Sequence, residues 1–219
     1  MVQNQPPPPE PKRRGRPRAY DPERALASAT RSFWRRGFSG TSLDDLAEAT
    51  GMNRPSLYGA FGDKRELYLT ALDRYVSVSR ASMDAALAAD VPLERALLRV
   101  YDLALALYFA EPDAPLGCFL IGTAATEAAV DGSVREKLGS GLRELTRAFE
   151  RRLKLARERG ELGRNADPKL LADLAGAVLH SIALRARAGD SRESLRAFAR
   201  SAVKHLCSGG RSRGSRRRQ

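Results

Sequence analysis

The sequence is poor in cysteine and histidine, with two residues of each kind among its 219. Cys118 and Cys207 are too few for a disulfide framework, and such scarcity is typical of proteins from a reducing cytoplasm. His180 and His205 are predicted to lie on separate helices, without cysteines or paired carboxylates at the spacing of metal ligands. We therefore expect no metal site and no cofactor.

The sequence also lacks long apolar runs and the motifs of common enzymes. No stretch of about 18 consecutive apolar residues is present, so we expect no membrane span. The proline-rich and then basic N-terminus has no apolar run of the kind found in secretory signals. A nucleophile elbow, a phosphate-binding loop and a glycine-rich dinucleotide turn are all missing, which argues against an enzyme.

A formal net charge of +12 is concentrated at the two ends of the chain. Residues 1–18 contain five basic residues and one acidic residue, and residues 208–219 contain five arginines and no acidic residue. Both ends are expected to be disordered. Two basic arms on a nearly neutral body favour contact with a polyanion such as nucleic acid, although such tails also serve as solubilising ends.

The N-terminal arm contains the motif Arg14-Gly15-Arg16-Pro17-Arg18, which resembles the minor-groove hook of proteins that bind AT-rich DNA. Arginines of such an arm can enter the narrow, electronegative minor groove. Arg14 and Arg16 are therefore candidate DNA-binding residues.

Residues 41–67 predict two short helices joined by a tight turn, with a third helix starting directly afterwards. Ser42 and Asp45 have the spacing of a capping box at the start of the first helix. Gly51 stands at the turn, where a residue that tolerates positive φ is favoured. Asn53 is placed to cap the second helix, and Pro55 fits its first turn.

The second of these helices has a surface suited to a DNA major groove. Leu57 and Phe61 are four residues apart and are predicted to face inward. The remaining surface carries a basic start, a hydroxyl, a phenol and two small residues, namely Arg54, Ser56, Tyr58, Gly59 and Ala60. A short helix with such side chains is suited to insertion into the major groove.

The order and spacing of these motifs resemble the TetR (tetracycline-repressor) family of bacterial regulators. The resemblance covers about residues 13–75 and is carried by the helix at 22–37, Phe38-Ser39-Gly40-Thr41-Ser42, Leu57-Tyr58-x-x-Phe61 and Asp63-Lys64-x-x-Leu67. Further on, Gly117-Cys118-Phe119-Leu120 and Arg185-Ala186-Arg187-Ala188-Gly189 resemble patterns in one branch of that family. Ala60 departs from the family, because this slot often holds a bulky side chain that contacts bases, and the operator sequence stays open.

The resemblance implies that Ser56, Tyr58 and Lys64 contact DNA. Chemically, the Tyr58 hydroxyl and the Lys64 ammonium suit phosphates, whereas Arg54 and Ser56 suit base edges. The full set of candidate DNA-binding residues is Arg14, Arg16, Thr41, Ser42, Arg54, Pro55, Ser56, Tyr58, Gly59 and Lys64. The alternatives are that Tyr58 packs inside the domain, that Lys64 is an ordinary solvated charge, and that Thr41 and Ser42 only cap a helix.

Helical periodicity continues to the end of the chain, and no alternating strand pattern appears. Helices are predicted at 22–37, 43–50, 54–60, 64–88, 92–109, 117–130, 131–160, 168–188 and 191–206. The fold class is therefore all-α, with an N-terminal helix-turn-helix domain and a larger C-terminal helical domain. We place a basic arm at 1–18, the DNA-binding domain at 19–65, the ligand-binding and dimerisation domain at 66–207 and a basic tail at 208–219.

The family resemblance implies a pocket for a small-molecule inducer among the central helices. Candidate lining residues are Tyr101, Leu105, Tyr108, Phe109, Cys118, Phe119 and Phe149. Aromatic residues at helical spacing are equally a feature of an ordinary core. Cys118 is either a sensing thiol or inert packing, and the apolar segment around it favours packing; thiol labelling of the native protein distinguishes the two.

The last two predicted helices leave an apolar stripe without a partner in a monomer. A four-helix bundle made of two helices from each of two subunits would bury it. The candidate interface residues are Leu174, Val178, Ile182, Leu195, Phe198 and Ala202. Such a homodimer would present two DNA-binding helices to the two halves of a palindromic operator.

Together these features predict a ligand-responsive, sequence-specific DNA-binding transcriptional regulator. We favour a homodimeric repressor that a small-molecule inducer releases from double-stranded operator DNA, in a bacterial cytoplasm and associated with the nucleoid. Two rivals are an architectural DNA-binding protein that relies on its basic arms and a small-molecule-binding helical enzyme. The sequence leaves open the inducer, the target genes, repression against activation, and the number of dimers on each operator.

Overall fold

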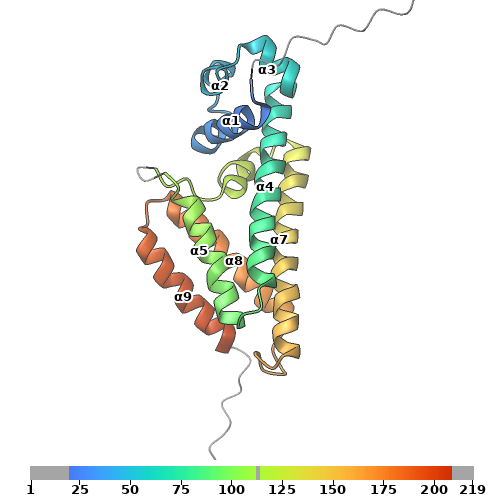
Figure 1. The fold of residues 1–219 in the computed structure, drawn as a ribbon, viewed down its shortest axis with the longest axis vertical. Coiled ribbons are helices and arrows are strands. Elements are labelled where there is room, and N and C mark those ends of the chain that lie inside the picture. Colours follow the sequence, from blue (N-terminus) through green and yellow to red (C-terminus); the bar gives the residue numbers. More distant parts are fainter. Residues whose placement is uncertain (1–19, 112–113, 209–219) are drawn as a thin grey trace, which may run out of the picture.

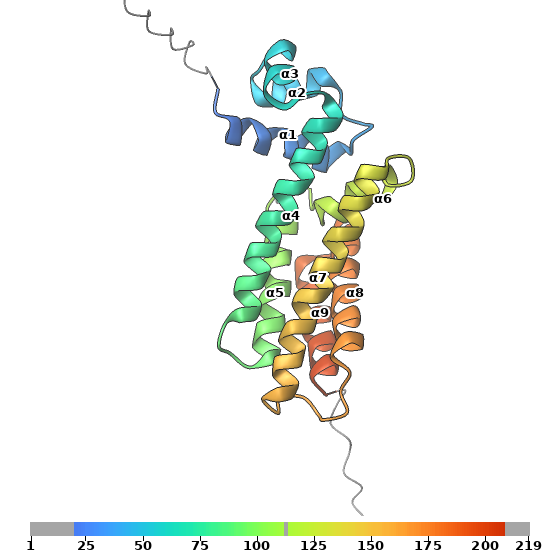
Figure 2. The same ribbon diagram turned by 90° about the vertical axis from the view of Figure 1, so that its right-hand side faces the viewer.

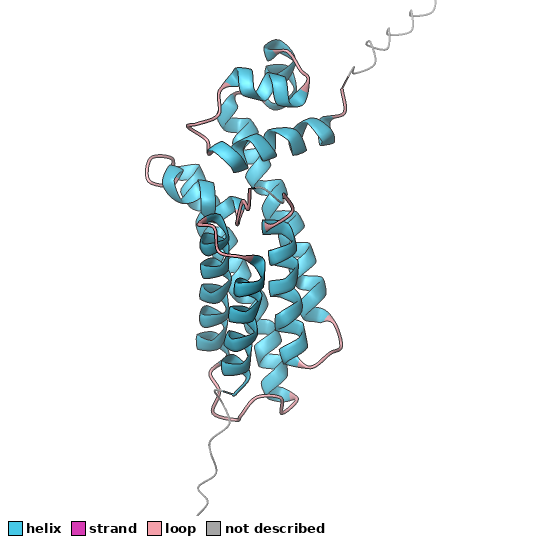
Figure 3. Cartoon of the chain, turned by 90° about the vertical axis from the view of Figure 1, so that its left-hand side faces the viewer, coloured by secondary structure: helices cyan, strands magenta, loops and turns pink. Residues whose placement is uncertain are grey.

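The computed structural model describes residues 20–111 and 114–208. The regular elements in these two ranges are all helical, as Figure 3 shows, and the all-α prediction is confirmed. In chain order they are α1 (Pro22–Arg36), α2 (Leu43–Thr50), α3 (Arg54–Phe61), α4 (Lys64–Ala88), α5 (Leu93–Tyr108), the π-helical turn η1 (Leu120–Ala124), α6 (Ala125–Glu127), α7 (Gly132–Glu158), α8 (Pro168–Arg187) and α9 (Arg192–Ser208).

Helices α1–α3 form a small unit, the head, at one end of the molecule (Figure 1). Helix α4 runs from the head into a larger lower bundle, where it lies beside α5 and α7. The same long helix contacts α1 and α3 in the head. Figure 2 shows α4, α7 and α8 running lengthwise in the lower bundle, with α4 continuing upward to the head.

Two predicted segments lie largely outside the described residues. The basic arm at 1–18, with Arg14 and Arg16, falls there entirely, and so does the tail beyond Ser208. Ser208 itself was predicted to belong to a disordered tail, but it is the last residue of α9. The single helix predicted at 117–130 is also wrong in detail, because η1 and the short α6 replace it.

Aspartate side chains define the starts of four helices. Each accepts hydrogen bonds from first-turn amides that have no partner within their own helix, and these caps are Asp21, Asp63, Asp131 and Asp167. At α1, for example, Oδ1 of Asp21 accepts from the amide of Glu23 at 2.9 Å. The negative charges also complement the positive ends of the helix dipoles.

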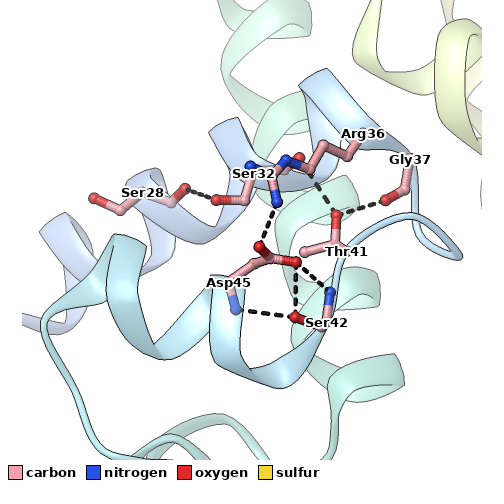
Figure 4. Close-up of polar contacts among 7 residues, drawn as sticks. All are labelled: Ser28, Ser32, Arg36, Gly37, Thr41, Ser42 and Asp45. Carbon is pink, nitrogen blue, oxygen red and sulfur yellow. Dashed lines mark hydrogen bonds and ion pairs between the residues drawn. The ribbon is translucent and has the colours of Figure 1, made fainter.

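The turn between α2 and α3 has the expected helix-turn-helix geometry. Ser42 and Asp45 form a reciprocal capping box, in which the Asp45 amide donates to the Ser42 hydroxyl at 3.1 Å (Figure 4). The Ser42 amide donates in turn to Oδ2 of Asp45 at 2.8 Å. Gly51 ends α2 with a φ of 67°, in the left-handed region that favours glycine. Oδ1 of Asn53 then caps α3 by accepting from the Ser56 amide at 2.9 Å.

The apolar interior is divided into an upper core and a lower core. The upper core joins α1–α3 to the first half of α4 and to the η1 segment, and it contains the edge-on and tilted rings of Phe33, Trp34, Tyr68 and Phe119. The lower core fills the space among α5, α7, α8, α9 and the end of α4. Cys118 packs against both cores, so the segment around η1 lies at their border.

The capping box gives a first prediction. Replacing Ser42 with alanine removes the oxygen that accepts from the Asp45 amide, and we expect the free energy of unfolding to fall by about 1 kcal/mol. Urea unfolding at a fixed protein concentration measures the difference. The control is Ser77→Ala on an exposed part of α4, which should change stability by less than about 0.5 kcal/mol. Equal effects in the two variants would contradict the capping role.

Candidate functional site

Helix α3 presents a continuous surface of its own at the tip of the head. Arg54, Pro55, Tyr58 and Gly59 are exposed, whereas Leu57 is buried. Tyr58 is 47% exposed, so the alternative in which it packs inside the domain is wrong. A side chain added at Gly59 would meet no atom within 4 Å, which shows that nothing in the protomer obstructs this face.

Arg54 is tied to the neighbouring helix through an ion pair. Its Nε donates to Oδ1 of Asp44 at 2.9 Å, and its Nη2 lies 2.6 Å from both carboxylate oxygens. These contacts raise the pKa of Arg54, which therefore stays charged. Both partners are largely exposed, and exposed ion pairs are weak in water, so the guanidinium is free to exchange Asp44 for another acceptor.

Lys64 is not simply a solvated charge. Its side chain is half-buried and its ammonium lies 4.3 Å from the centre of the Phe38 ring, a cation–π geometry. Because Lys64 is the first residue of α4, this contact holds a positive charge beside the end of α3. The ammonium keeps its ability to donate hydrogen bonds on the side that faces away from the ring.

Thr41 and Ser42 have their hydroxyls engaged within the protein. Thr41 is fully buried and its hydroxyl donates to the carbonyl of Gly37 at 2.7 Å (Figure 4), so its predicted place among the DNA-contacting side chains is a misassignment. The Ser42 hydroxyl accepts from the Asp45 amide and lies 2.7 Å from the Asp45 carboxylate. Hydrogen bonds from the Ser42 amide and hydroxyl, and from Arg36, lower the pKa of Asp45 to about 2. A carboxylate that stays ionised here disfavours an approaching phosphate.

A cavity of about 240 Å³ lies within the lower bundle, between α4, α5, α7, α8 and the segment that leads into η1. Most of its wall is aliphatic, with Val76, Val100, Leu107, Leu142, Leu145 and Leu179 among the lining residues. Val78 and Leu103, which also line it, are 57% and 47% exposed and mark its opening to solvent. An apolar wall with a few polar groups is typical of a small-molecule site.

Two of the seven predicted pocket residues, Tyr108 and Cys118, line this cavity. The other five do not. Tyr101, Leu105 and Phe149 belong to the lower core, Phe109 packs against that core, and Phe119 belongs to the upper core. Helical geometry explains this difference. The strongest apolar stripe of α5 faces the core, whereas Leu103 and Leu107 line the cavity from another face of the helix. Sequence reasoning also missed Tyr75 and His180, for which no local motif gives a signal.

The polar groups of the cavity wall are few. The Tyr75 hydroxyl donates to Sγ of Cys118 at 3.4 Å, and the Tyr108 hydroxyl also hydrogen-bonds to this sulfur. Burial raises the pKa of the Cys118 thiol above its usual value, so the sulfur carries a proton and has little nucleophilic character. Burial lowers the pKa of His180, which is neutral at pH 7, and Nε2 of this ring is buried without a hydrogen-bond partner among the described residues.

One short segment joins the cavity to the head. We call Leu116–Ala124 together with Arg187 the joint. The Arg187 guanidinium donates from Nη1 to the carbonyls of Trp34, on α1, at 3.1 Å and of Leu116 at 3.2 Å. The Trp34 indole donates to the same Leu116 carbonyl at 3.2 Å. Gly117 has a φ of 63°, and a Cβ there would lie 2.3 Å from the Ala183 carbonyl oxygen, so only glycine fits.

The joint also makes apolar and polar contacts with residues of α1 and α4. The Phe119 ring centre lies 5.8 Å from that of Trp34 and 5.9 Å from that of Tyr68. The hydroxyls of Tyr68 and Thr123 are 2.8 Å apart in a buried hydrogen bond. Within the joint, Cys118, Leu120 and Ile121 line the cavity. The joint therefore contacts both the cavity and the aromatic residues of α1 and α4.

The predicted interface residues divide into two groups. Ile182 and Leu195 are fully buried in the core of their own protomer, so their assignment to an interface is wrong. Leu174 is 47% exposed, and the remaining three, Val178, Phe198 and Ala202, are half-buried. Two exposed leucines that were not predicted, Leu170 and Leu184, share a face of α8 with Leu174, because they lie about one turn before it and three turns after it.

Two negative findings apply to residues 20–111 and 114–208. None of the helices in these ranges combines the length and the hydrophobicity that a membrane span requires. Within the same residues, no three side chains of His, Cys, Asp or Glu are grouped so that they could hold a metal ion.

Two family models match the chain. Residues 25–71 match the bacterial regulatory proteins of the tetR family, and residues 92–202 match the tetracyclin repressor-like C-terminal domain. The first match contains α2 and α3, and the second contains most of the lower bundle.

Individual relatives agree with these matches. The chain is 34% identical to the HTH-type transcriptional repressor ComR of Escherichia coli K12, over 84% of this chain and 88% of ComR. It is 29% identical to the HTH-type regulator YezE of Bacillus subtilis 168, over 72% of this chain and 81% of YezE. A solved structure of the TetR family regulator CifR, a cysteine mutant in complex with 26-bp operator DNA, superposes with a TM-score of 0.76 at 30% identity, covering 87% of this chain and 98% of CifR. The chain therefore belongs to the tetR family of bacterial regulatory proteins.

Proposed function

We propose that this regulator is a ligand-responsive repressor, which binds a palindromic operator as a homodimer and leaves it when a small molecule enters the cavity of the lower bundle. The observation that carries the proposal is the joint, because this one segment lines the cavity and also packs against α1 of the head and the adjoining half of α4. The repressor ComR and the operator complex of CifR, both similar to this chain, support it. No residue is assigned a catalytic role.

The surface of α3 is the proposed base-reading surface, within a DNA-binding domain at 19–65. Tyr58 and Lys64 would bind phosphates on either side of it, while Arg54 and Ser56 would meet base edges, with Pro55 and Gly59 allowing close approach. The release of Arg54 from Asp44 would accompany binding. Arg14 and Arg16 of the N-terminal arm would enter the adjacent minor groove. A protein with these contacts would act at the nucleoid, in a bacterial cytoplasm.

The proposed dimer forms through residues of the 66–207 domain, on the exposed face of α8. Leu170, Leu174 and Leu184 are between 47% and 56% exposed on that face, which is an unfavourable arrangement for an isolated protomer in water. The half-buried side chains of Val178, Phe198 and Ala202 would complete the contact. Packing α8 and α9 against their copies would bury these residues and fix the distance between the two heads.

The joint is the proposed route from the cavity to the head. A ligand that presses on Leu120 or Ile121 would displace η1, and π-helical turns are a frequent feature of functional segments because their hydrogen bonding is irregular. Phe119 and the Leu116 carbonyl would move with it, and Trp34 would carry α1. The spacing of the two heads would then no longer match successive major grooves.

Operator recognition is tested by selecting bound sites from a random DNA library with the full chain. We expect an enriched near-palindrome. Tyr58→Ala and Lys64→Ala should each reduce affinity for it at least tenfold, since each removes a phosphate contact, and Lys204→Ala on the exposed far end of α9 is the control. Binding without enrichment that disappears as salt rises would contradict the proposal and favour an architectural protein.

Dimer formation is tested by Leu174→Asp, which places a charge in the centre of the α8 face. We expect the variant to sediment as a monomer and to lose most of its operator affinity, because a single head reads only half a site. Leu155→Asp is the matched control, since Leu155 is a partly exposed leucine of α7 outside that face. A Leu174→Asp protein that remains dimeric at micromolar concentration would rule out this interface.

The joint is tested with Arg187→Lys, which keeps the charge but removes the planar guanidinium that bridges two carbonyls. We expect the fluorescence of Trp34, the only tryptophan in the chain, to shift to longer wavelength, and operator affinity to fall about fivefold or more. The control is Arg185→Lys, because Arg185 pairs with Asp190 at the same end of α8. Unchanged emission and unchanged affinity in Arg187→Lys would contradict a coupling role for this residue.

A further inference from the structure

We propose that the cavity takes a neutral, ring-sized apolar molecule bearing one hydroxyl group, whose oxygen hydrogen-bonds to Nε2 of His180. The inference rests on the proposed function, because it takes this cavity to be the effector site. It adds the chemical class of the effector and names the residue that selects it. Three observations carry it: the volume of the cavity, the charges around it and the unpaired nitrogen.

The volume limits the size of the ligand. An apolar cavity of about 150 Å³ is large enough to bind benzene. The cavity here, at about 240 Å³, holds a six-membered ring with a few further non-hydrogen atoms. Ligand pockets typically span about 300–1,000 Å³, so the part of a ligand that this cavity encloses is small.

The charges around the cavity argue against an ionic ligand. Arg80 is the only basic residue of the wall with a permanent charge, and it is already paired with Glu144 at 2.8 Å and with Asp84 at 3.5 Å. These groups lie at the exposed rim, and no unpaired charge faces the interior. A carboxylate or an ammonium would therefore lose its hydration without gaining a partner, which is costly on an aliphatic wall.

The polar atoms in the cavity wall favour a ligand with a single hydrogen-bonding group. The hydroxyls of Tyr75 and Tyr108 are already directed to the sulfur of Cys118. Nε2 of His180 is buried without a partner among the described residues, and its ring lies in the wall of the cavity. A neutral imidazole nitrogen accepts from a hydroxyl or donates to it according to its tautomer. A ligand hydroxyl at this point would satisfy a buried polar atom that otherwise has no hydrogen bond.

The test compares three probes by calorimetry with the full-length dimer: the isosteric pair 4-methylphenol and 1,4-dimethylbenzene, and the slightly larger anion 4-methylbenzoate. In the unmodified protein we expect the first two to bind and the carboxylate to fail. His180→Leu should lower the ratio of the 4-methylphenol affinity to the 1,4-dimethylbenzene affinity about three- to tenfold, which is the value of one hydrogen bond. His180→Gln, which keeps a hydrogen-bonding group, should restore part of the ratio.

Two controls locate the effect. His205→Leu changes the other histidine, which is exposed on α9, and should leave the ratio unchanged. Ala104→Phe fills the cavity from α5 and should weaken both neutral probes together. An unaltered ratio in His180→Leu, preferential binding of 4-methylbenzoate, or a failure of all three probes would overturn the inference. The selection of operator sites uses no ligand. A negative result with the three probes is therefore distinguishable from a failure of the proposed function.

Discussion

The carbonyl oxygen of Leu116 accepts hydrogen bonds from the Trp34 indole and the Arg187 guanidinium, each at 3.2 Å, and the two parts of the molecule meet at this atom. Both of its lone pairs are used, and the same guanidinium nitrogen also reaches the Trp34 carbonyl at 3.1 Å. A polar network whose members are all paired favours one arrangement over its neighbours, because any displacement leaves a donor or an acceptor unsatisfied. The orientation of α1, and with it that of the head, is therefore defined from the lower bundle.

Steric constraints also act on the joint. Gly117 packs against the backbone of α8 with no room for a side chain, and the Phe119 ring is enclosed by the aromatic residues of α1 and α4. The segment is thus held on the α8 side by backbone contact and on the head side by ring contacts. Its third side faces the cavity through Leu120 and Ile121. The wall of the cavity formed by Leu120 and Ile121 is therefore connected to the head through Phe119.

Helix boundaries and the α3 surface were predictable, because their signals are local. Asp21, Asp63, Asp131 and Asp167 cap helices within three residues of themselves, and the exposure of Tyr58 follows from the inward positions of its neighbours. The cavity was not predictable, because residues from five separate segments form its wall. Helical periodicity identifies residues that face the core, and for this reason it selected Tyr101 and Leu105, which do not line the cavity. Arg187 contacts Trp34 across 153 positions of sequence, beyond the reach of any local pattern.

The free energy that couples ligand binding to operator binding can be compared with the free energy of the Arg187 hydrogen bonds. A ligand shifts a conformational equilibrium only by the difference between its affinities for the two states. Allosteric effects on affinity are typically five- to 150-fold, which corresponds to about 1–3 kcal/mol. The two Arg187 hydrogen bonds, at about 1 kcal/mol each in net terms, fall in this range. Release of α1 would therefore require the loss of these bonds and a small displacement of Phe119, while both apolar cores stay packed and the head itself stays folded.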